Sequence, residues 1–439
     1  MDGASYGQHF GRRSAAAEAL TVTKPGECGS TGAAPADDPD RQDELMLERA
    51  KFLLQPSTRS AVPPFMVMDV MAAAARLEAQ GRRIIHMEVG QPAAAAPATA
   101  IAAARAALSS GPLGYTETLG VASLRRRIAH AYGEWHGVDL DPARIVVTTG
   151  SSAGFMLAFL AAFEAGDRVA MALPGYPPYR HILAALGGEP VGIETTASTR
   201  WSITGEALLA QHRARELKGL ILASPANPTG TMMTAAALAE LIRCAEDAGI
   251  AVISDEIYHG LDYAFAAETA ARISPDAIVV NSFSKYFCMT GWRIGWMVVP
   301  PALVRAIERL QQNLAISVPT LSQIAAEAAF DGRPELEEVR HGYEDNRRIL
   351  LDGLPGAGLD SFLPVDGAFY LYADISRFST DSFAFATRML EEAGVAATPG
   401  IDFDPVHGKN FLRLCYAGAL AEMREAVERI GNWLRKGAY

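Results

Sequence analysis

The sequence lacks several features that would place it in a specialised class of protein. No apolar run reaches the roughly 18 residues that a membrane-spanning helix needs, and the first residues show no signal-peptide pattern. The four cysteines have neither metal-ligand spacing nor a disulfide pattern. Excess positive charge is also missing, because the net charge is −11, and this disfavours nucleic acid and anionic membranes as partners. These absences predict a cytoplasmic globular protein with no metal, no membrane contact and no nucleic-acid partner.

The chain has enough length and apolar content to bury large cores. Its 439 residues are 49% hydrophobic and 20% charged, which is ordinary for a globular protein of two or more domains. Residues 1–43 are rich in Gly, Ala, Ser, Pro and Asp without an apolar period, and we expect a disordered tail there. A transit peptide or an overextended start site remain alternatives for this segment, although its aspartates disfavour a transit peptide.

From residue 101 to about residue 300, helical and strand-like patterns alternate. The β-branched run Ile145–Thr149 predicts a strand that is buried on both faces. Further strands are expected at 84–89, 168–172, 219–224, 250–254, 277–281 and 294–299. This alternation predicts an α/β fold whose mainly parallel sheet is covered by helices on both faces.

After Pro300 the pattern changes to long helices, at 302–315, 321–330 and 335–351, followed by strand-like runs at 368–373 and 411–415. This change predicts a second, smaller α+β domain. The expected division is a tail at 1–43, the N-terminal part of the small domain at 44–95, a large domain at 96–310 and the C-terminal small domain at 311–439.

Lys285 ends one of the expected buried strands, within Asn281-Ser282-Phe283-Ser284-Lys285. Lysine is rarely buried without a reason, and its neutral amine forms Schiff bases with carbonyls. Arg293 follows eight residues later and is well shaped to bind a phosphate. An aldehyde that carries a phosphate explains both residues, and pyridoxal phosphate is such a molecule. The alternative is a lysine in a solvated turn.

Ligands of parallel sheets bind outside the carboxyl ends of the strands. The candidate functional residues fall at those ends: Gly150, Tyr176, Asn227, Asp255, Tyr258 and Lys285. An aspartate there can pair with a protonated pyridine nitrogen, although it could instead cap a helix. Arg413, in an apolar strand of the second domain, suits a substrate carboxylate or a structural salt bridge about equally well.

In combination, five motifs resemble those of the class I aminotransferases, which are fold-type I pyridoxal-phosphate enzymes. They are SPANPTG at 224–230, SDEIY at 254–258, NSFSK at 281–285, MTGWRIGW at 289–296 and FLRLCYA at 411–417. The likeness runs from about Phe65 to Leu434. It implies the fold-type I architecture and an activity that moves an amino group from an L-amino acid to a 2-oxo acid.

The resemblance also implies roles for single residues. Lys285 would hold the cofactor as the internal aldimine, Asp255 would bind the pyridine nitrogen, and Tyr258 would act with them in catalysis. Asn227 and Tyr258 would bind the ring oxygen, and Tyr176 would stack on the ring. The residues implied for the phosphate are Gly150, Ser151, Ser152, Ser282, Arg293 and, from the neighbouring subunit of a homodimer, Tyr115.

For the substrate, the resemblance implies that Arg413 binds the α-carboxylate, with contacts from Gly90 and Asn227. One departure concerns the loop after Pro92, where relatives often carry an acidic and an aromatic residue but this chain has Ala93-Ala94-Ala95-Ala96. Substrate contacts from this loop are therefore in doubt.

After the substrate amine displaces Lys285 from the cofactor aldehyde, the freed lysine would transfer the Cα proton. The amino acid and the 2-oxo acid would react in two successive half-reactions, which give ping-pong kinetics. A β-lyase or synthase on the same scaffold is the nearest alternative, because the cofactor residues do not set the reaction. A transcription regulator that uses such a domain as a ligand sensor is a further alternative, but residues 1–43 are too few and too acidic for a DNA-binding domain. The amino donor stays open.

Overall fold

The computed structural model describes residues 56–437, and the expected tail at 1–43 lies outside them. The largest sheet in this range has seven strands in the order β2-β8-β7-β6-β5-β3-β4. Neighbouring strands are parallel except β8, which runs antiparallel to both β2 and β7. Its strands are β2 Ile145–Thr148, β3 Arg168–Leu173, β4 Glu189–Glu194, β5 Gly219–Ala223, β6 Ala251–Asp255, β7 Ile278–Ser282 and β8 Gly295–Val298.

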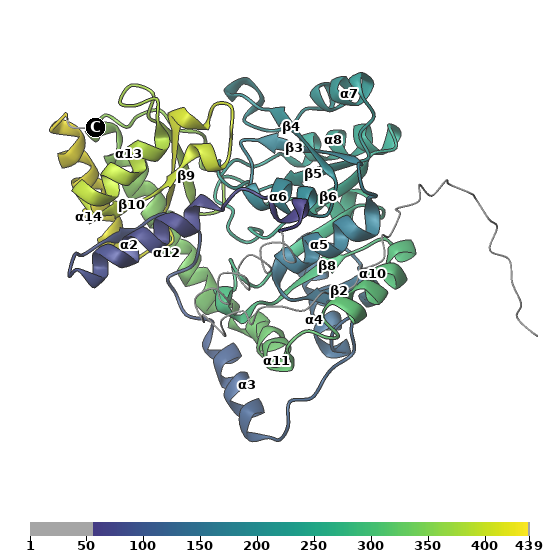
Figure 1. The fold of residues 1–439 in the computed structure, drawn as a ribbon. Coiled ribbons are helices and arrows are strands. Elements are labelled where there is room, and N and C mark those ends of the chain that lie inside the picture. The colour runs from purple at the N-terminus through teal and green to yellow at the C-terminus, as the bar shows by residue number, and fades with distance from the viewer. Residues whose placement is uncertain (1–55, 438–439) are drawn as a thin grey trace, which may run out of the picture. The chain divides into compact units, whose positions relative to one another are not determined.

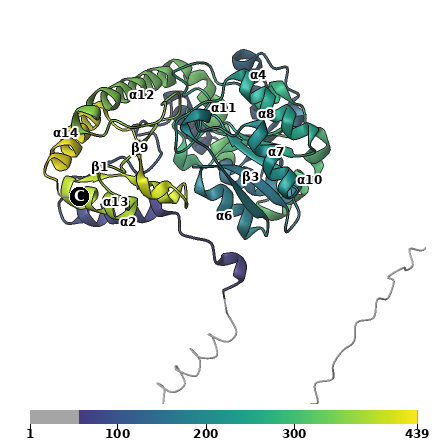
Figure 2. The same ribbon diagram turned by 90° about the horizontal axis from the view of Figure 1, so that it is seen from above.

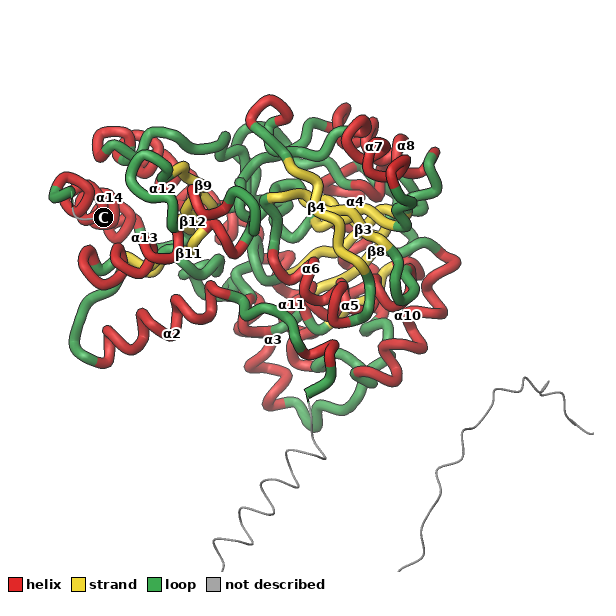
Figure 3. Tube along the Cα trace, turned by 45° about the horizontal axis from the view of Figure 1, so that its top comes forward, coloured by secondary structure: helices red, strands yellow, loops and turns green. Residues whose placement is uncertain are grey.

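Helices cover both faces of this sheet (Figure 3). Successive side chains of a strand point to opposite faces, so Val146 packs in one apolar cluster and Val147 in another. Residues of α5, α6 and α10 share the cluster of Val146, and residues of α4, α7 and α8 share that of Val147. These helices are α4 Ala122–His136, α5 Gly150–Ala162, α6 Pro177–Ala185, α7 Gly205–Ala214, α8 Ala235–Asp247 and α10 Pro301–Leu314. The predicted mainly parallel, doubly covered sheet is confirmed.

The C-terminal part of the chain forms a smaller antiparallel sheet, in the order β11-β12-β9. Its strands are β9 Tyr370–Asp374, β11 Thr398–Pro399 and β12 Phe411–Cys415. A short strand from early in the chain, β1 Ile85–His86, pairs in parallel with β10 Val395–Ala396. Helix α2 Met66–Ala79 also lies beside these C-terminal strands, so segments from both ends of the described chain lie together (Figure 1).

The remaining helices connect and cover these sheets. The long helix α12 packs against α14 beside the smaller sheet (Figure 2). The bounds of these remaining helices are α3 Ala98–Ser109, α9 Ala270–Ile273, α11 Thr320–Ala329, α12 Arg333–Gly353, α13 Ser382–Arg388 and α14 Leu420–Arg435. The domain boundaries that we expect at residues 95 and 310 stay a prediction.

One expected strand is much shorter in the structure, and one strand of the structure was not expected. The strand expected at 84–89 pairs only over Ile85–His86, because the chain then turns toward Gly90. Strand β4 was not predicted, since its glycine and proline obscure the β pattern. Within residues 56–437, no helix is both long and apolar enough to span a membrane.

Candidate active site

Lys285 lies just beyond the end of β7, where the sequence predicted it. The turn that carries it is held by the Ser282 hydroxyl, which lies 2.8 Å from the Ser284 hydroxyl and accepts a 3.1 Å hydrogen bond from the Ser284 amide. The Lys285 Nζ donates to the Gly90 carbonyl oxygen at 2.6 Å. Burial lowers the pKa of Lys285 to about 8, and the positive charge of Arg413 acts in the same direction. The amine is thus closer to its neutral, nucleophilic form than an exposed lysine would be.

Asp255 ends β6, the strand next to β7. Its side chain is buried, and it accepts hydrogen bonds from the Ile257 amide at 3.1 Å and from the Tyr179 hydroxyl. Burial raises the pKa of Asp255 to about 7 despite these two donors. A cation placed against this carboxylate would restore its negative charge, so the position suits the protonated nitrogen of a pyridine ring.

The start of α5 and Arg293 form a cradle for an anion. Gly150, the first residue of α5, has a φ of +73°, and a β-carbon there would overlap the Arg293 guanidinium. The first amides of a helix have no partner within the helix and attract anions. Ser151 is half-buried beside Gly150, and Ser152 is exposed. Amides and an arginine at one point are the donor set that a phosphate group requires.

The side chains of Tyr258 and Asn227 are both hydrogen-bonded to other side chains. The Tyr258 hydroxyl lies 2.7 Å from the Tyr370 hydroxyl. The Asn227 side-chain oxygen accepts a 2.9 Å hydrogen bond from Arg413. Tyr176 packs edge-on against Tyr179, with ring centroids 5.2 Å apart, and is half-buried.

Arg413 lies in β12 and is only 2% exposed. Besides Asn227, its guanidinium donates to the Thr398 hydroxyl at 3.1 Å and to the Glu88 carbonyl. Its central carbon lies 4.5 Å from the ring centroid of Tyr370 and 4.7 Å from that of Phe403. The guanidinium is thus enclosed by polar acceptors and aromatic rings.

No carboxylate within residues 56–437 forms an ion pair with this guanidinium, and Arg413 Nε has no hydrogen-bond partner there. The structural salt bridge that the sequence left open is therefore not formed within this part of the chain. Asp402 lies near enough to interact with the charge of Arg413 but forms no ion pair with it. A buried cation without a paired carboxylate is costly, so the arrangement fits a site that receives the carboxylate of a ligand.

The structure adds three side chains that sequence reasoning missed: Tyr179, Tyr370 and Thr398. Tyr179 orients Asp255, while Tyr370 and Thr398 contact Arg413. Only Tyr179 could have been found from the sequence, because it lies three residues after Tyr176, at the start of α6. Tyr115 is not brought to the site within one chain, because it is 82% exposed.

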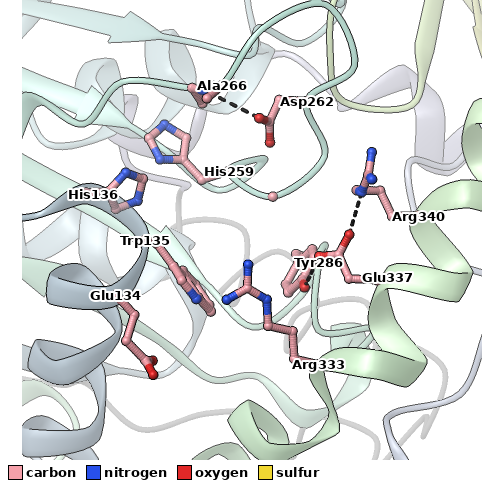
Figure 4. Close-up of a pocket in the computed structure, with 12 residues that line it drawn as sticks. Glu134, Trp135, His136, His259, Asp262, Ala266, Tyr286, Arg333, Glu337 and Arg340 are labelled. Atoms are coloured by element: carbon pink, nitrogen blue, oxygen red, sulfur yellow. Dashed lines mark hydrogen bonds and ion pairs between the residues drawn. The ribbon is translucent and has the colours of Figure 1, made fainter.

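A separate cavity of about 350 Å³ contains none of the predicted site residues (Figure 4). Its walls include His259 and Tyr286, whose sequence neighbours are Tyr258 and Lys285. Burial lowers the pKa of His259 to about 4, so this imidazole is neutral. The cavity is therefore distinct from the predicted site, although residues next to Tyr258 and Lys285 line it.

Comparison with known proteins places this geometry in a family. The family model described as "Aminotransferase class I and II" matches residues 82–430. A valine–pyruvate aminotransferase of Mycobacterium tuberculosis is 48% identical over 380 residues, which cover 86% of this chain and 97% of that protein.

Solved structures agree with the sequence comparison. The structure of an aminotransferase from M. tuberculosis superposes with a TM-score of 0.85 at 47% identity, covering 87% of this chain and all of that chain. The aspartate aminotransferase of Thermus thermophilus with maleate superposes with a TM-score of 0.81 at 32% identity and the same coverage. The chain belongs to the class I and II aminotransferase family, whose members use pyridoxal phosphate, and it is a transaminase that acts on amino acids and 2-oxo acids.

Proposed function

We propose that this transaminase takes a neutral aliphatic L-amino acid such as valine as its donor and pyruvate as its acceptor. The observation that carries the substrate class is the buried Arg413, which forms no ion pair with a carboxylate within residues 56–437. Amino acid and 2-oxo acid both bring an α-carboxylate that would meet this guanidinium. Arg413 would hold it through two parallel hydrogen bonds, because the planar fork matches carboxylate geometry.

The two arginines that residues 56–437 place near the Lys285 amine support a neutral substrate side chain. Two arginines act on the Lys285 amine, Arg413 and Arg293. The first is assigned to the α-carboxylate and the second to the phosphate, so neither is left for an acidic side chain. The loop Ala93–Ala96 offers no charge either. The relative that is 48% identical is named for valine and pyruvate, which supports this choice over aspartate.

We assign the cofactor contacts to the residues predicted from the sequence. Lys285 would bond to the aldehyde carbon of pyridoxal phosphate, and Asp255, oriented by Tyr179, would face the ring nitrogen. Gly150, Ser151, Ser152, Ser282 and Arg293 would hold the phosphate. Tyr258 and Asn227 would face the ring oxygen, and Tyr176 would cover the ring.

When bound, pyridoxal phosphate supplies an aldehyde that can bond to amines and a ring that stores the electron pair of the Cα–H bond. Lys285 Nζ would take the proton from the substrate Cα and deliver it to the former aldehyde carbon of the cofactor, since its pKa near 8 lets it do both near neutral pH. Asp255 would keep the ring nitrogen protonated, and Arg413 would fix the substrate so that its Cα–H bond points toward Lys285.

We further propose a cytoplasmic homodimer in which Tyr115 reaches the phosphate site of the partner subunit. The 82% exposure of this large aromatic residue supports a role outside its own subunit. Sedimentation of the purified protein tests the assembly, and an active monomer would remove Tyr115 from the phosphate site.

The substrate proposal is tested by supplying L-valine with pyruvate, L-aspartate with 2-oxoglutarate, and mixed pairs, and by measuring both products. We expect kcat/KM for valine with pyruvate to exceed that for aspartate by at least about tenfold, because a side-chain carboxylate would have no partner. Higher activity with aspartate would contradict the proposal. Release of ammonia from a β-substituted amino acid without any 2-oxo acid present would instead support the β-lyase alternative.

A further inference from the structure

Tyr370, a residue with no role in the site as assigned above, contacts three of its functional parts. It lies in β9 and is 1% exposed. The Arg413 guanidinium stacks over one face of its ring, and its hydroxyl lies 2.7 Å from the hydroxyl of Tyr258. A β-carbon on Gly90 would overlap this same hydroxyl, and Gly90 is the residue whose carbonyl receives the Lys285 amine.

The hydrogen bond between the two tyrosines can run in either direction, and the direction decides what Tyr258 can do. A phenol has one proton to donate and can accept further hydrogen bonds. If Tyr258 donates to Tyr370, its proton is used within the pair. If Tyr370 donates, the Tyr258 proton stays available for another acceptor.

Arg413 favours Tyr370 as the donor. Burial raises the pKa of Tyr370, and the positive charge of Arg413 opposes that rise. A cation on the ring withdraws electron density from the hydroxyl and makes it a better proton donor. The same burial keeps both phenols protonated, so the pair works by orienting protons rather than by losing them.

We propose that Tyr370 is a positioning residue whose hydroxyl donates to Tyr258 and thereby directs the Tyr258 proton to the ring oxygen of the bound cofactor. This inference rests on the proposed function, because it takes Tyr258 as the partner of that oxygen. Hydrogen bonds in a chain strengthen one another. Tyr370 therefore makes Tyr258 a stronger donor and lowers the basicity of the cofactor linkage at Lys285.

The test is a pH titration of the visible absorbance band of the holoenzyme for the wild type, Tyr370→Phe, Tyr258→Phe and the double variant. Phenylalanine keeps the ring under Arg413 and removes only the hydroxyl. We expect Tyr370→Phe to raise the titration midpoint by about 0.5 to 1 pH unit, and Tyr258→Phe to raise it further. In the double variant the midpoint should equal that of Tyr258→Phe alone, because Tyr370 acts only through Tyr258.

The matched control is Tyr372→Phe, a tyrosine of the same strand with the same 1% exposure, whose hydroxyl is directed to the Gly400 carbonyl. Its midpoint should equal that of the wild type. An unchanged midpoint in Tyr370→Phe, or an equal additional shift in the Tyr258→Phe background, would overturn the inference. Failure of the assigned role of Tyr258 would look different, since Tyr258→Phe itself would then leave the midpoint unchanged.

Discussion

Gly150 and Arg293 approach so closely at the start of α5 that any side chain at residue 150 would displace the arginine. Both residues have left-handed backbone angles, with φ of +73° and +50°. Such a conformation is uncommon for a non-glycine residue and clusters at functional sites. The backbone thus brings the guanidinium to the helix amides, where the two together would bind the phosphate of the cofactor.

Gly150→Ala should therefore weaken cofactor binding by about ten- to hundredfold, because charge-assisted hydrogen bonds to the phosphate are lost. Cofactor affinity would be measured by titrating the apoenzyme with pyridoxal phosphate. Gly166→Ala is the matched control, because Gly166 also has a positive φ but no atom within 4 Å of the added β-carbon. Equal losses of affinity in the two variants would point to backbone strain instead of displacement of Arg293.

The apoenzyme should capture pyridoxal phosphate faster as the pH rises, with a midpoint near 8. Burial lowers the pKa of the Lys285 amine to about 8. The amine is therefore mostly protonated and unreactive below that pH, and mostly neutral above it. Stopped-flow absorbance against pH measures the midpoint, and borohydride should trap the adduct in the wild type but not in Lys285→Ala. A midpoint near 10, or an adduct that persists in the variant, would remove Lys285 from its assigned role.

Asp255→Asn should lower turnover by orders of magnitude, since the ring nitrogen would lose its counter-charge. It should also change how the stability of the apoenzyme depends on pH. The folded pKa of Asp255 is about 7 against an ordinary value of 3.8, so between these values only the folded state holds the proton. The free energy of unfolding of the wild type therefore falls as the pH rises from about 4 to about 7.

The asparagine variant cannot lose this proton, so its stability relative to the wild type should increase across that pH window and then stay constant. Urea unfolding of both apoenzymes at several pH values measures the difference. A difference that is independent of pH would mean that Asp255 is already ionised in the folded apoenzyme.

Arg413→Lys should raise KM for the amino donor and lower kcat, reducing kcat/KM by about a hundredfold or more. Lysine keeps the charge but cannot reach Asn227, Thr398 and a substrate carboxylate in one plane. Cofactor absorbance should stay unchanged. The exposed Arg377→Lys is the control, with kinetics like the wild type. Loss of cofactor or unfolding, with normal kinetics in the protein that remains, would show that Arg413 is structural.

The positions of Lys285 and Asp255 could be derived from the sequence, because they follow directly from a local pattern. A buried β-branched run predicts a strand, parallel strands align their carboxyl ends, and the residues just beyond these ends share one edge of the sheet. The same reasoning located Gly150 at a helix start. For these residues the local sequence and the fold class together were sufficient.

The partners of these residues were decided only by the tertiary structure. Tyr179 and Asp255 are separated by 76 residues, Tyr258 and Tyr370 by 112, and Gly90 and Lys285 by 195. No periodicity connects such distant segments, because their contact depends on how α6, β9 and the turn at Gly90 pack around the end of the larger sheet. For the same reason, the sequence could place Arg413 in a strand, whereas only the packed structure shows it fully buried against two aromatic rings without an ion pair in residues 56–437.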